Sequence, residues 1–435
     1  MTCYGVIADD LTGAMDAGVQ MLEQNYVVRV AFDIQKLPEW ESQSDVIIMS
    51  TESRNVPMEK AYSQVLEALE GFRQQDCRLI YKKIDSTLRG NIGAELSAVL
   101  KSGQADCVIV APALPFNGRT TVNGVHYVYG SPLENTELAK DPYAPVYESE
   151  ISMIIQEQYP AQVGMIDIRT IRNGAESVSA GIEECVARGT RLLVADAIDD
   201  GDLRSIVQGS ALYRGRLLLC GSAGLFKHIE QLGSIRAMGM HTKLHLPRRK
   251  RSAPVLVLSG SPARMSKLQI KRFEESCDRS YVLRVNVAHL AGGETEYREA
   301  CADAARITAA KLKEGCHVVV DASGDSKENI LNYYQDNWQE LQAVRKKVLG
   351  FLGEMALAAA DAVGLRGLVL FGGDTAVAVT RKLGAGGIEI TREIEPYIPL
   401  GVLIGGEHTN VPVVTKSGGF GREDSLVSIV KKLEQ

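Results

Sequence analysis

Two adjacent carboxylates follow the first apolar segment of the chain. Residues 4–8 read as a short buried strand, and Asp9 and Asp10 come directly after it. A third acid, Asp16, lies within the next helical segment. One aspartate would be enough to cap that helix. Because ligands of open α/β sheets bind at the carboxyl ends of strands, three acids here favour a functional site, with Asp9 or Asp10 as a proton acceptor or a carboxylate beside a metal.

A second polar cluster follows the strand predicted at 79–84. It contains Lys82, Lys83, Asp85, Ser86 and Arg89. The guanidinium of Arg89 suits a carboxylate, and the hydroxyl of Ser86 can form short hydrogen bonds. Since successive side chains of a strand point to opposite faces, at most one of the two lysines is expected to reach a pocket at strand level. A capped helix start with ordinary surface charge is the alternative, but this concentration of polar groups favours a site.

Arg54 follows the strand predicted at 45–51 and is another candidate to bind an anion. Taken alone, it reads almost equally well as an ordinary loop arginine. It gains weight because strands ending near Asp9, Arg54 and Lys82 would be neighbours in one sheet. Neighbouring parallel strands present their carboxyl ends on one edge, so these side chains are expected to lie together.

The strand predicted at 106–111 runs into a segment rich in Pro, Gly and Asn, which ends at His126. Rigid turn residues of this kind often build a binding loop, and this one also carries Arg119. His126 is a candidate general base. A structural role is the better interpretation, because a single histidine without a partner motif is more often part of the core.

Three glycine-rich turns follow strand-like segments in the second half of the chain. They contain Ser259 and Gly260, then Gly372, Gly373, Asp374 and Thr375, and finally Gly418. Backbone N–H groups at such turns bind phosphate without any side-chain charge. Each turn alone is a weak signal, but together they predict a cradle for nucleotide phosphates. Neither a Walker sequence nor a GxGxxG fingerprint is present, so a P-loop and a dinucleotide site are not expected.

The elements that must position these residues form an α/β pattern. Short apolar strands alternate with longer helical segments, which is typical of parallel sheets flanked by helices. The 435 residues are enough for two such domains. A basic, proline-bracketed stretch at 241–254 reads as a linker. We therefore expect a substrate-binding domain at 1–240 and a nucleotide-binding domain at 255–435.

Composition excludes several classes of protein. The net charge of −6 argues against a nucleic-acid binder, which needs a basic face. No apolar stretch approaches the roughly 20 residues of a membrane span, and no leader sequence is evident. The eight cysteines are widely spaced without a CxxC pair, so free thiols in the cytoplasm are expected and a zinc site is not.

Together these motifs resemble the four-carbon acid sugar kinase family. The similarity covers nearly the whole chain in family order. The matching segments are 7–16, 82–90, 111–124, 258–262, 372–376 and 416–421. The resemblance implies an N-terminal domain for the sugar acid and a C-terminal domain for ATP, used with a divalent metal such as Mg²⁺. The metal ligands are not assigned.

The resemblance also implies roles for individual residues. The substrate would be bound by Asp9, Arg54, Lys82, Lys83, Asp85, Ser86 and Arg89. ATP would be held by Ser259, Gly372, Gly373, Asp374, Thr375 and Gly418. The expected catalytic residues are Asp9, Asp10 and Asp374. Asp9 or Asp10 would accept the proton of the attacking hydroxyl, with Asp85 as second choice, whereas Asp374 would be a base or a Mg²⁺ ligand.

The expected activity is ATP-dependent phosphorylation of threonate or erythronate to the 4-phosphate. The form Leu-Thr-Gly-Ala-Met-Asp at 11–16 favours the threonate branch, with D-threonate as substrate. A two-domain sensor that binds sugar acid and nucleotide without transferring phosphate is the alternative. The partners are then small molecules, with neither nucleic acid nor membrane, and a homo-oligomer is compatible with the sequence.

Overall fold

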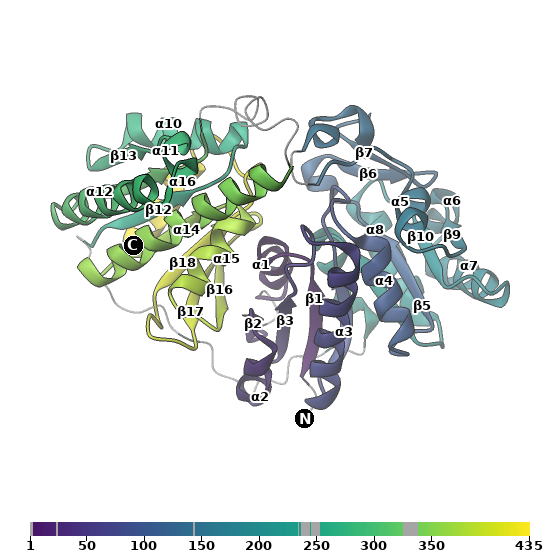
Figure 1. The fold of residues 1–435 in the computed structure, drawn as a ribbon. Helices are drawn as coiled ribbons and strands as arrows, with labels where there is room; N and C mark the ends of the chain where they lie inside the picture. The colour runs from purple at the N-terminus through teal and green to yellow at the C-terminus, as the bar shows by residue number, and fades with distance from the viewer. Residues whose placement is uncertain are drawn as a thin grey trace. The chain divides into compact units, whose positions relative to one another are not determined.

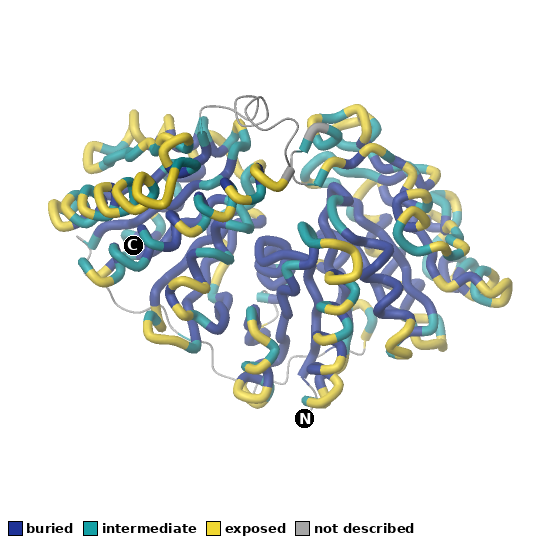
Figure 2. Tube along the Cα trace, in the orientation of Figure 1, coloured by how far each residue is buried: buried dark blue, intermediate teal, exposed yellow. Residues whose placement is uncertain are grey.

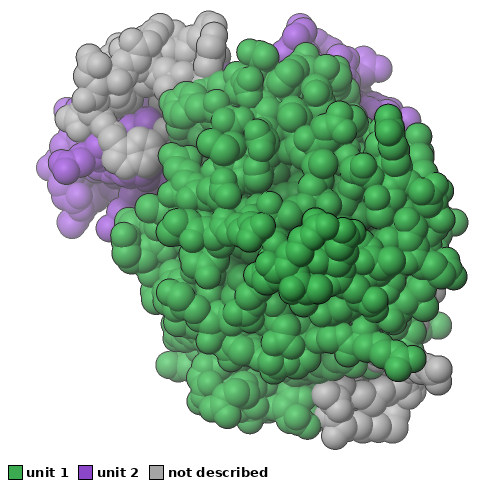
Figure 3. Space-filling model, turned by 90° about the vertical axis from the view of Figure 1, so that its right-hand side faces the viewer, with its two compact units in different colours: residues 1–242 green, residues 243–435 purple. Residues whose placement is uncertain are grey.

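The structure, a computed structural model, describes residues 3–22, 25–141, 144–233, 253–324 and 338–435, together with residues 235 and 244. The chain divides into two compact units, residues 1–242 and 243–435, which have different colours in Figure 3. Both units are α/β, so the expected fold class is confirmed. Most of the predicted linker at 241–254 lies outside the described residues, and the exact domain limits remain a prediction.

A parallel sheet forms the centre of unit 1 (Figure 1). Its strands, in spatial order, are β2 (Val28–Ala31), β3 (Val46–Ser50), β1 (Tyr4–Ala8), β4 (Arg78–Lys83), β11 (Leu217–Gly221), β5 (Cys107–Ala111), β10 (Leu192–Ala195) and β9 (Val163–Ile166). Its helices are α1 (Leu11–Val19), α2 (Leu37–Trp40), α3 (Met58–Gln74), α4 (Ile92–Lys101), α5 (Ile151–Gln158), α6 (Ile168–Arg172), α7 (Ala175–Ala187), α8 (Asp200–Leu212) and α9 (Ala223–Phe226).

The order of the strands explains why the predicted polar residues lie together. The strands β1, β3 and β5 are buried along their whole length, as their continuous apolar sequences require in a sheet covered on both faces (Figure 2). In the sheet β1 lies between β3 and β4. The segments that follow these three parallel strands therefore begin at one edge, and the expectation of a shared edge is confirmed.

A small antiparallel sheet replaces the loop expected after β5. It consists of β6 (Arg119–Val122), β7 (Val125–Val128) and β8 (Ser131–Pro132). Asn123 and Gly124 form the turn between β6 and β7 with φ angles of 52° and 75°. An Asn-Gly pair between strands is the usual signal of such a hairpin, because both turn residues need positive φ. Interpreting this segment as an irregular loop was wrong for that reason.

Unit 2 also has a largely parallel sheet, as expected. Its strands, in spatial order, are β13 (Ser280–Arg284), β14 (His317–Asp321), β12 (Val255–Ser259), β15 (Gly367–Phe371), β18 (Pro412–Lys416), β17 (Ile398–Ile404) and β16 (Gly387–Glu395). The last two run antiparallel and were not predicted. The helices are α10 (Arg264–Ser276), α11 (Val287–Ala291), α12 (Glu294–Lys313), α14 (Trp338–Ala362), α15 (Gly373–Lys382) and α16 (Ser425–Glu434).

The strands β12, β15 and β18 are adjacent and parallel in unit 2. The three predicted glycine turns follow these strands, so they begin at the same edge of the sheet. Among the described residues no helix is both long enough and apolar enough to cross a membrane.

Candidate active site

Arg54 binds both acids that follow β1. Its Nε and Nη2 donate to the two Asp9 carboxylate oxygens at 2.9 and 3.1 Å. Its Nη1 and Nη2 each donate to one oxygen of Asp10 at 2.7 Å. Asp10 also accepts a hydrogen bond from Gly13 N at 2.8 Å and so caps α1. Asp10 is therefore the helix cap, and Arg54 is already paired with two carboxylates of its own chain.

The loop that carries Arg54 is held by α4 and its preceding turn. The side-chain amide of Asn91 donates to the carbonyls of Ser53 and Val56, both at 2.8 Å. Gly90 has a φ of 103°, and a Cβ there would lie 3.0 Å from the Arg54 side chain. These contacts fix the guanidinium beside the acids, and they require glycine and asparagine at 90 and 91.

The two acids differ in their electrostatics. Burial opposes ionisation of Asp9, but the positive charges of Arg54, Lys83 and Lys82 outweigh it and lower its pKa. Burial raises the pKa of Asp10, and the neighbouring charge of Asp9 raises it further, against the influence of Arg54. Asp9 is thus the ionised partner of Arg54, and Asp10 is the stronger proton acceptor.

The two lysines of β4 have different surroundings, as alternation along a strand requires. Lys82 is fully buried, and its Nζ lies 2.5 Å from Glu95 of α4. Lys83 Nζ lies on the other side, beside Gly13 of α1, and donates to the carbonyl of Ile84 at 2.8 Å. No ion pair of Lys83 is found within the described part of the chain. Lys83 is therefore the lysine of the two that can bind an anionic ligand without breaking an ion pair of the described residues.

The remaining predicted substrate residues follow β4. Asp85 accepts hydrogen bonds from Arg89 Nε at 2.5 Å and Thr87 at 2.6 Å. Burial works against its ionisation, but Arg89 and Arg54 hold the pKa of Asp85 well below its usual value, which makes it a weak base. Ser86 accepts a hydrogen bond from Arg119 Nη1 at 2.6 Å. Asp85 thus orients Arg89, while Arg119 of β6 reaches the same edge.

His126 is a structural residue. It is fully buried, its Nε2 lies 2.9 Å from the carbonyl of Ser86, and its Nδ1 lies 3.0 Å from the hydroxyl of Thr121. Because a carbonyl only accepts, Nε2 carries the proton. Burial lowers the pKa of His126 to about 4. The imidazole fixes the hairpin to the segment after β4, in agreement with the structural interpretation.

The glycine turns of unit 2 meet closely. A Cβ on Gly260 would lie 2.7 Å from the Thr375 hydroxyl, and a Cβ on Gly418 would lie 2.1 Å from the Ser261 hydroxyl. Gly372 has a φ of 99° and precedes α15, whose first turn has no side-chain cap. The backbone N–H groups of this turn can therefore bind phosphate oxygens.

Ser259 is fully buried at the end of β12, and its hydroxyl has no hydrogen-bond partner among the described residues. Asp374, in the first turn of α15, forms an ion pair with Arg345 of α14 at 2.6 Å. Arg345 was not predicted, because it lies about thirty residues before the turn in an ordinary helical pattern. Arg345 therefore balances the charge of Asp374 beside the predicted phosphate site.

The residues near these turns fit a metal that arrives with the nucleotide. Mg²⁺ usually keeps several waters and binds through one or two carboxylates and the phosphates. Asp374 offers one carboxylate beside the glycine turn. No group of three or more His, Cys, Asp or Glu side chains in the described ranges could hold a metal by itself.

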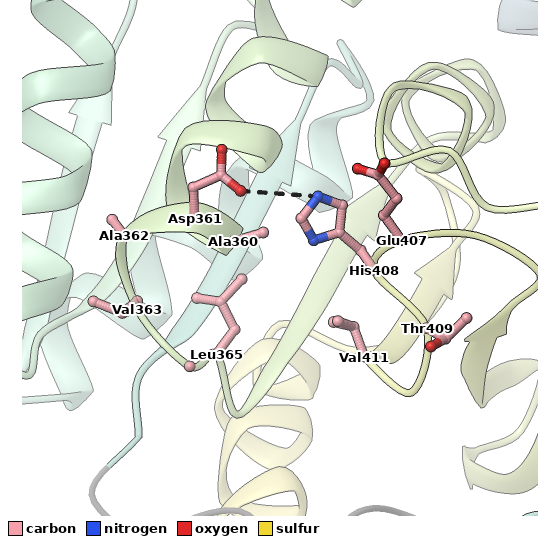
Figure 4. Close-up of a pocket in the computed structure, with 10 residues that line it drawn as sticks. Ala360, Asp361, Ala362, Val363, Leu365, Glu407, His408, Thr409 and Val411 are labelled. Carbon is pink, nitrogen blue, oxygen red and sulfur yellow. Dashed lines mark ion pairs between the residues drawn. The ribbon is translucent and has the colours of Figure 1, made fainter.

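A cavity of about 420 Å³ lies elsewhere in unit 2 (Figure 4). Residues 360–365 and 407–409 line most of it, and Asp361 faces His408 at 3.9 Å. These segments precede β15 and β18, whereas the glycine turns follow the same strands. The cavity therefore contains none of the predicted nucleotide residues, and we assign it no role.

Comparison with known proteins finds a match for each of the two units. A family model described as a sugar-binding N-terminal domain matches residues 4–229, and one described as a nucleotide-binding C-terminal domain matches residues 256–426. The chain is 33% identical to the D-threonate kinase of Salmonella typhimurium, over 99% of this chain and 98% of that protein. The chain belongs to the four-carbon acid sugar kinase family. This confirms the expected family and identifies the chain as a kinase.

Other relatives of this four-carbon acid sugar kinase carry different substrate names. It is 30% identical to the D-erythronate kinase of Heliobacterium modesticaldum, over 98% of this chain and 96% of that protein. It is 29% identical to the 3-oxo-tetronate kinase of Pseudomonas savastanoi, over 99% and 97% of the two chains. A crystal structure of a Salmonella typhimurium protein described as a putative tRNA synthase has a TM-score of 0.79 at 24% identity, over 99% and 100% of the chains. That last likeness supports the fold alone.

Proposed function

We propose that this kinase transfers the γ-phosphoryl group of ATP to a four-carbon sugar acid, with D-threonate as the preferred substrate and the 4-hydroxyl as the acceptor. The observation that carries the proposal is the 33% identity to a D-threonate kinase along the whole chain. Two features of the structure support it, one for the acid and one for the nucleotide.

Lys83 is the proposed binding group for the substrate carboxylate. Arg54, Lys82 and Arg89 are each paired with carboxylates of the chain. Among the described residues, Lys83 donates to a backbone carbonyl only, at the edge where Ser86 and Arg119 also lie. In this proposal the other predicted substrate residues act differently: Arg54 and Asp85 orient the edge, while Lys82 and Glu95 support it from within.

ATP is proposed to lie on the turns of unit 2. The uncapped start of α15 would bind phosphate oxygens through backbone N–H groups, and the absence of a side chain at Gly260 and Gly418 would allow the turns to approach one another closely. The hydroxyl of Ser259 would donate a hydrogen bond to the nucleotide. Asp374 would hold Mg²⁺, which neutralises phosphate charge during transfer when it is bound.

Asp10 is the proposed proton acceptor. The substrate hydroxyl loses its proton to the Asp10 carboxylate as its oxygen bonds to the γ-phosphorus. The bond from that phosphorus to the bridging oxygen breaks, and ADP leaves. A raised pKa suits a base that works near neutral pH, and Asp10 has one, whereas Asp9 and Asp85 do not. Asp9 would keep Arg54 in position.

An ADP-release assay tests the proposal. The purified chain receives ATP, Mg²⁺ and one acid at a time: D-threonate, L-threonate, D-erythronate, L-erythronate or 3-oxo-tetronate. Acid-dependent ADP with the highest kcat/KM for D-threonate is the expected result. A higher kcat/KM for another acid would overturn the D-threonate preference alone. Binding of acid and nucleotide without ADP release would instead support a sensor. The cytoplasmic location and a homo-oligomer remain predictions.

A further inference from the structure

Asp16 is a buried acid that the proposed function does not use. It lies on α1, is 7% exposed, and belongs to a helix whose residues are all buried. Within the residues that the structure describes, no hydrogen bond or ion pair reaches its carboxyl group, and Oδ1 is fully enclosed without a partner. Buried polar groups of native proteins almost always have hydrogen-bond partners, so an unpaired carboxyl requires an explanation.

The position of Asp16 places it beside the proposed acid-binding lysine. Residues three apart on a helix share a face, so Asp16 lies on the same side of α1 as Gly13. Lys83 Nζ lies against Gly13 on that side. Of the neighbouring charges, that of Lys83 has the largest effect on the pKa of Asp16.

Other charged groups, on the elements around Asp16, also act on its pKa. They are Asp10 at the start of α1, Arg54 after β3 and Arg119 on β6. Of the neighbouring elements, α9 has an uncharged sequence, and Arg29 of β2 is hydrogen-bonded to Gln43. The charges that act on Asp16 are therefore those of the edge proposed to bind the sugar acid.

We propose that the Asp16 carboxyl contacts the sugar acid directly and exchanges hydrogen bonds with a substrate hydroxyl next to the carboxylate on Lys83. This inference rests on the proposed function, because it names a further contact for the same substrate. It makes Asp16 a determinant of which hydroxyl pattern the site accepts. A site built to bind a hydroxyl rejects analogues that lack it, since its buried polar group is then left unpaired.

The protonation state of Asp16 suits an anionic substrate. Burial raises its pKa to about 8, and Asp10 raises it while Lys83 lowers it. At neutral pH the carboxyl is then mostly protonated, so it does not repel the acid and can both donate and accept. Above pH 8 it ionises and repels the substrate. We expect kcat/KM for the acid to fall about tenfold between pH 7 and pH 9.

The test compares Asp16→Asn and Asp16→Ala with the unchanged kinase. Asparagine keeps a hydrogen-bond donor and a hydrogen-bond acceptor but cannot ionise. In D16N the decline of kcat/KM near pH 8 is therefore expected to disappear. Alanine keeps neither, so D16A is expected to lower kcat/KM for the acid at pH 7 by about tenfold or more, and by more than D16N does. KM for ATP should stay within about twofold in both variants. Calorimetric binding of the acid at pH 7 and pH 9 gives a second measurement that does not depend on turnover.

Asp303→Asn is the matched control, because Asp303 is an exposed acid of α12 that pairs with Arg306. In D303N, kcat/KM for the acid should fall between pH 7 and pH 9 as it does in the unchanged kinase. Persistence of that decline in D16N, or an unchanged kcat/KM in D16A, would overturn the role of Asp16 while leaving the proposed function intact. If the unchanged kinase neither binds nor phosphorylates any of the acids, both proposals fail.

Discussion

Lys83 Nζ lies against Gly13, because a methyl group at position 13 would come within 2.8 Å of it and within 2.7 Å of Asp10 Oδ1. Both atoms belong to side chains, so the ammonium and the Asp10 carboxylate would have to move. We expect Gly13→Ala to raise KM for the sugar acid at least about fivefold and to change KM for ATP by less than about twofold. Gly293→Ala is the control, because a Cβ there meets only open space. Equal effects of the two substitutions would contradict a role for Lys83 in acid binding.

The buried pair of Lys82 and Glu95 gives a prediction for stability. Removing Glu95 leaves the buried Lys82 ammonium without its ion-pair partner, which typically costs about 3–5 kcal/mol. Glu95→Ala should lower the free energy of unfolding by that amount, as measured by urea denaturation. The double variant Lys82→Met with Glu95→Leu removes both charges and should recover most of the loss. A Glu95→Ala protein within about 1 kcal/mol of the unchanged chain would refute this account of the pair.

Because His126 is buried in its neutral form, we expect the protein to lose stability in acid. Its pKa is about 4 in the folded chain and about 6.5 when unfolded, so its neutral form is favoured by folding. That stability is complete above pH 6.5 and is lost as pH falls towards 4. At pH 5 the loss is about 2 kcal/mol. In His126→Gln, where an amide can still donate to Ser86, denaturation at pH 7 and pH 5 should show a correspondingly smaller difference. An equal difference would argue against a neutral, buried His126.

Substitution of Ser259 should weaken nucleotide binding without affecting the stability of the fold. Its buried hydroxyl forms no hydrogen bond with the described residues, so removing it breaks none of them. Ser259→Ala should keep the melting temperature but raise KM for ATP about tenfold, since a hydrogen bond to a charged group is lost. Thr308→Val is the control, because Thr308 of α12 is also a buried hydroxyl without a partner among the described residues. An unchanged KM for ATP in Ser259→Ala would remove this residue from the nucleotide site.

The sequence was sufficient to predict the edges at which the polar residues lie. Apolar runs ending in Asp9, Arg54 and Lys82 predict neighbouring parallel strands, and β1, β3 and β4 are neighbours. The glycine turns after β12, β15 and β18 were found in the same way. These predictions succeed because both depend on local patterns and on the rule that parallel strands share a carboxyl edge.

The pairing of charges could not be read from the sequence. Nothing in the order of residues says that Arg54 binds Asp9 and Asp10, because the partners lie more than forty residues apart. Glu95 was detectable as the one charged residue in the segment 92–100. A buried acid needs a partner, and that partner is Lys82. The hairpin at Asn123 and Gly124 was predictable from its turn chemistry and was missed.

Transfer of labelled phosphate tests the central claim most directly. The chain is incubated with D-threonate, Mg²⁺ and ATP labelled in the γ-phosphate, and the acid product is isolated. We predict labelled four-carbon acid phosphate with the unchanged chain and a loss of about a hundredfold or more with Asp10→Asn, whose nucleotide binding should persist. Label released only as inorganic phosphate, or no release at all with any of the five acids, would contradict phosphoryl transfer to a sugar acid.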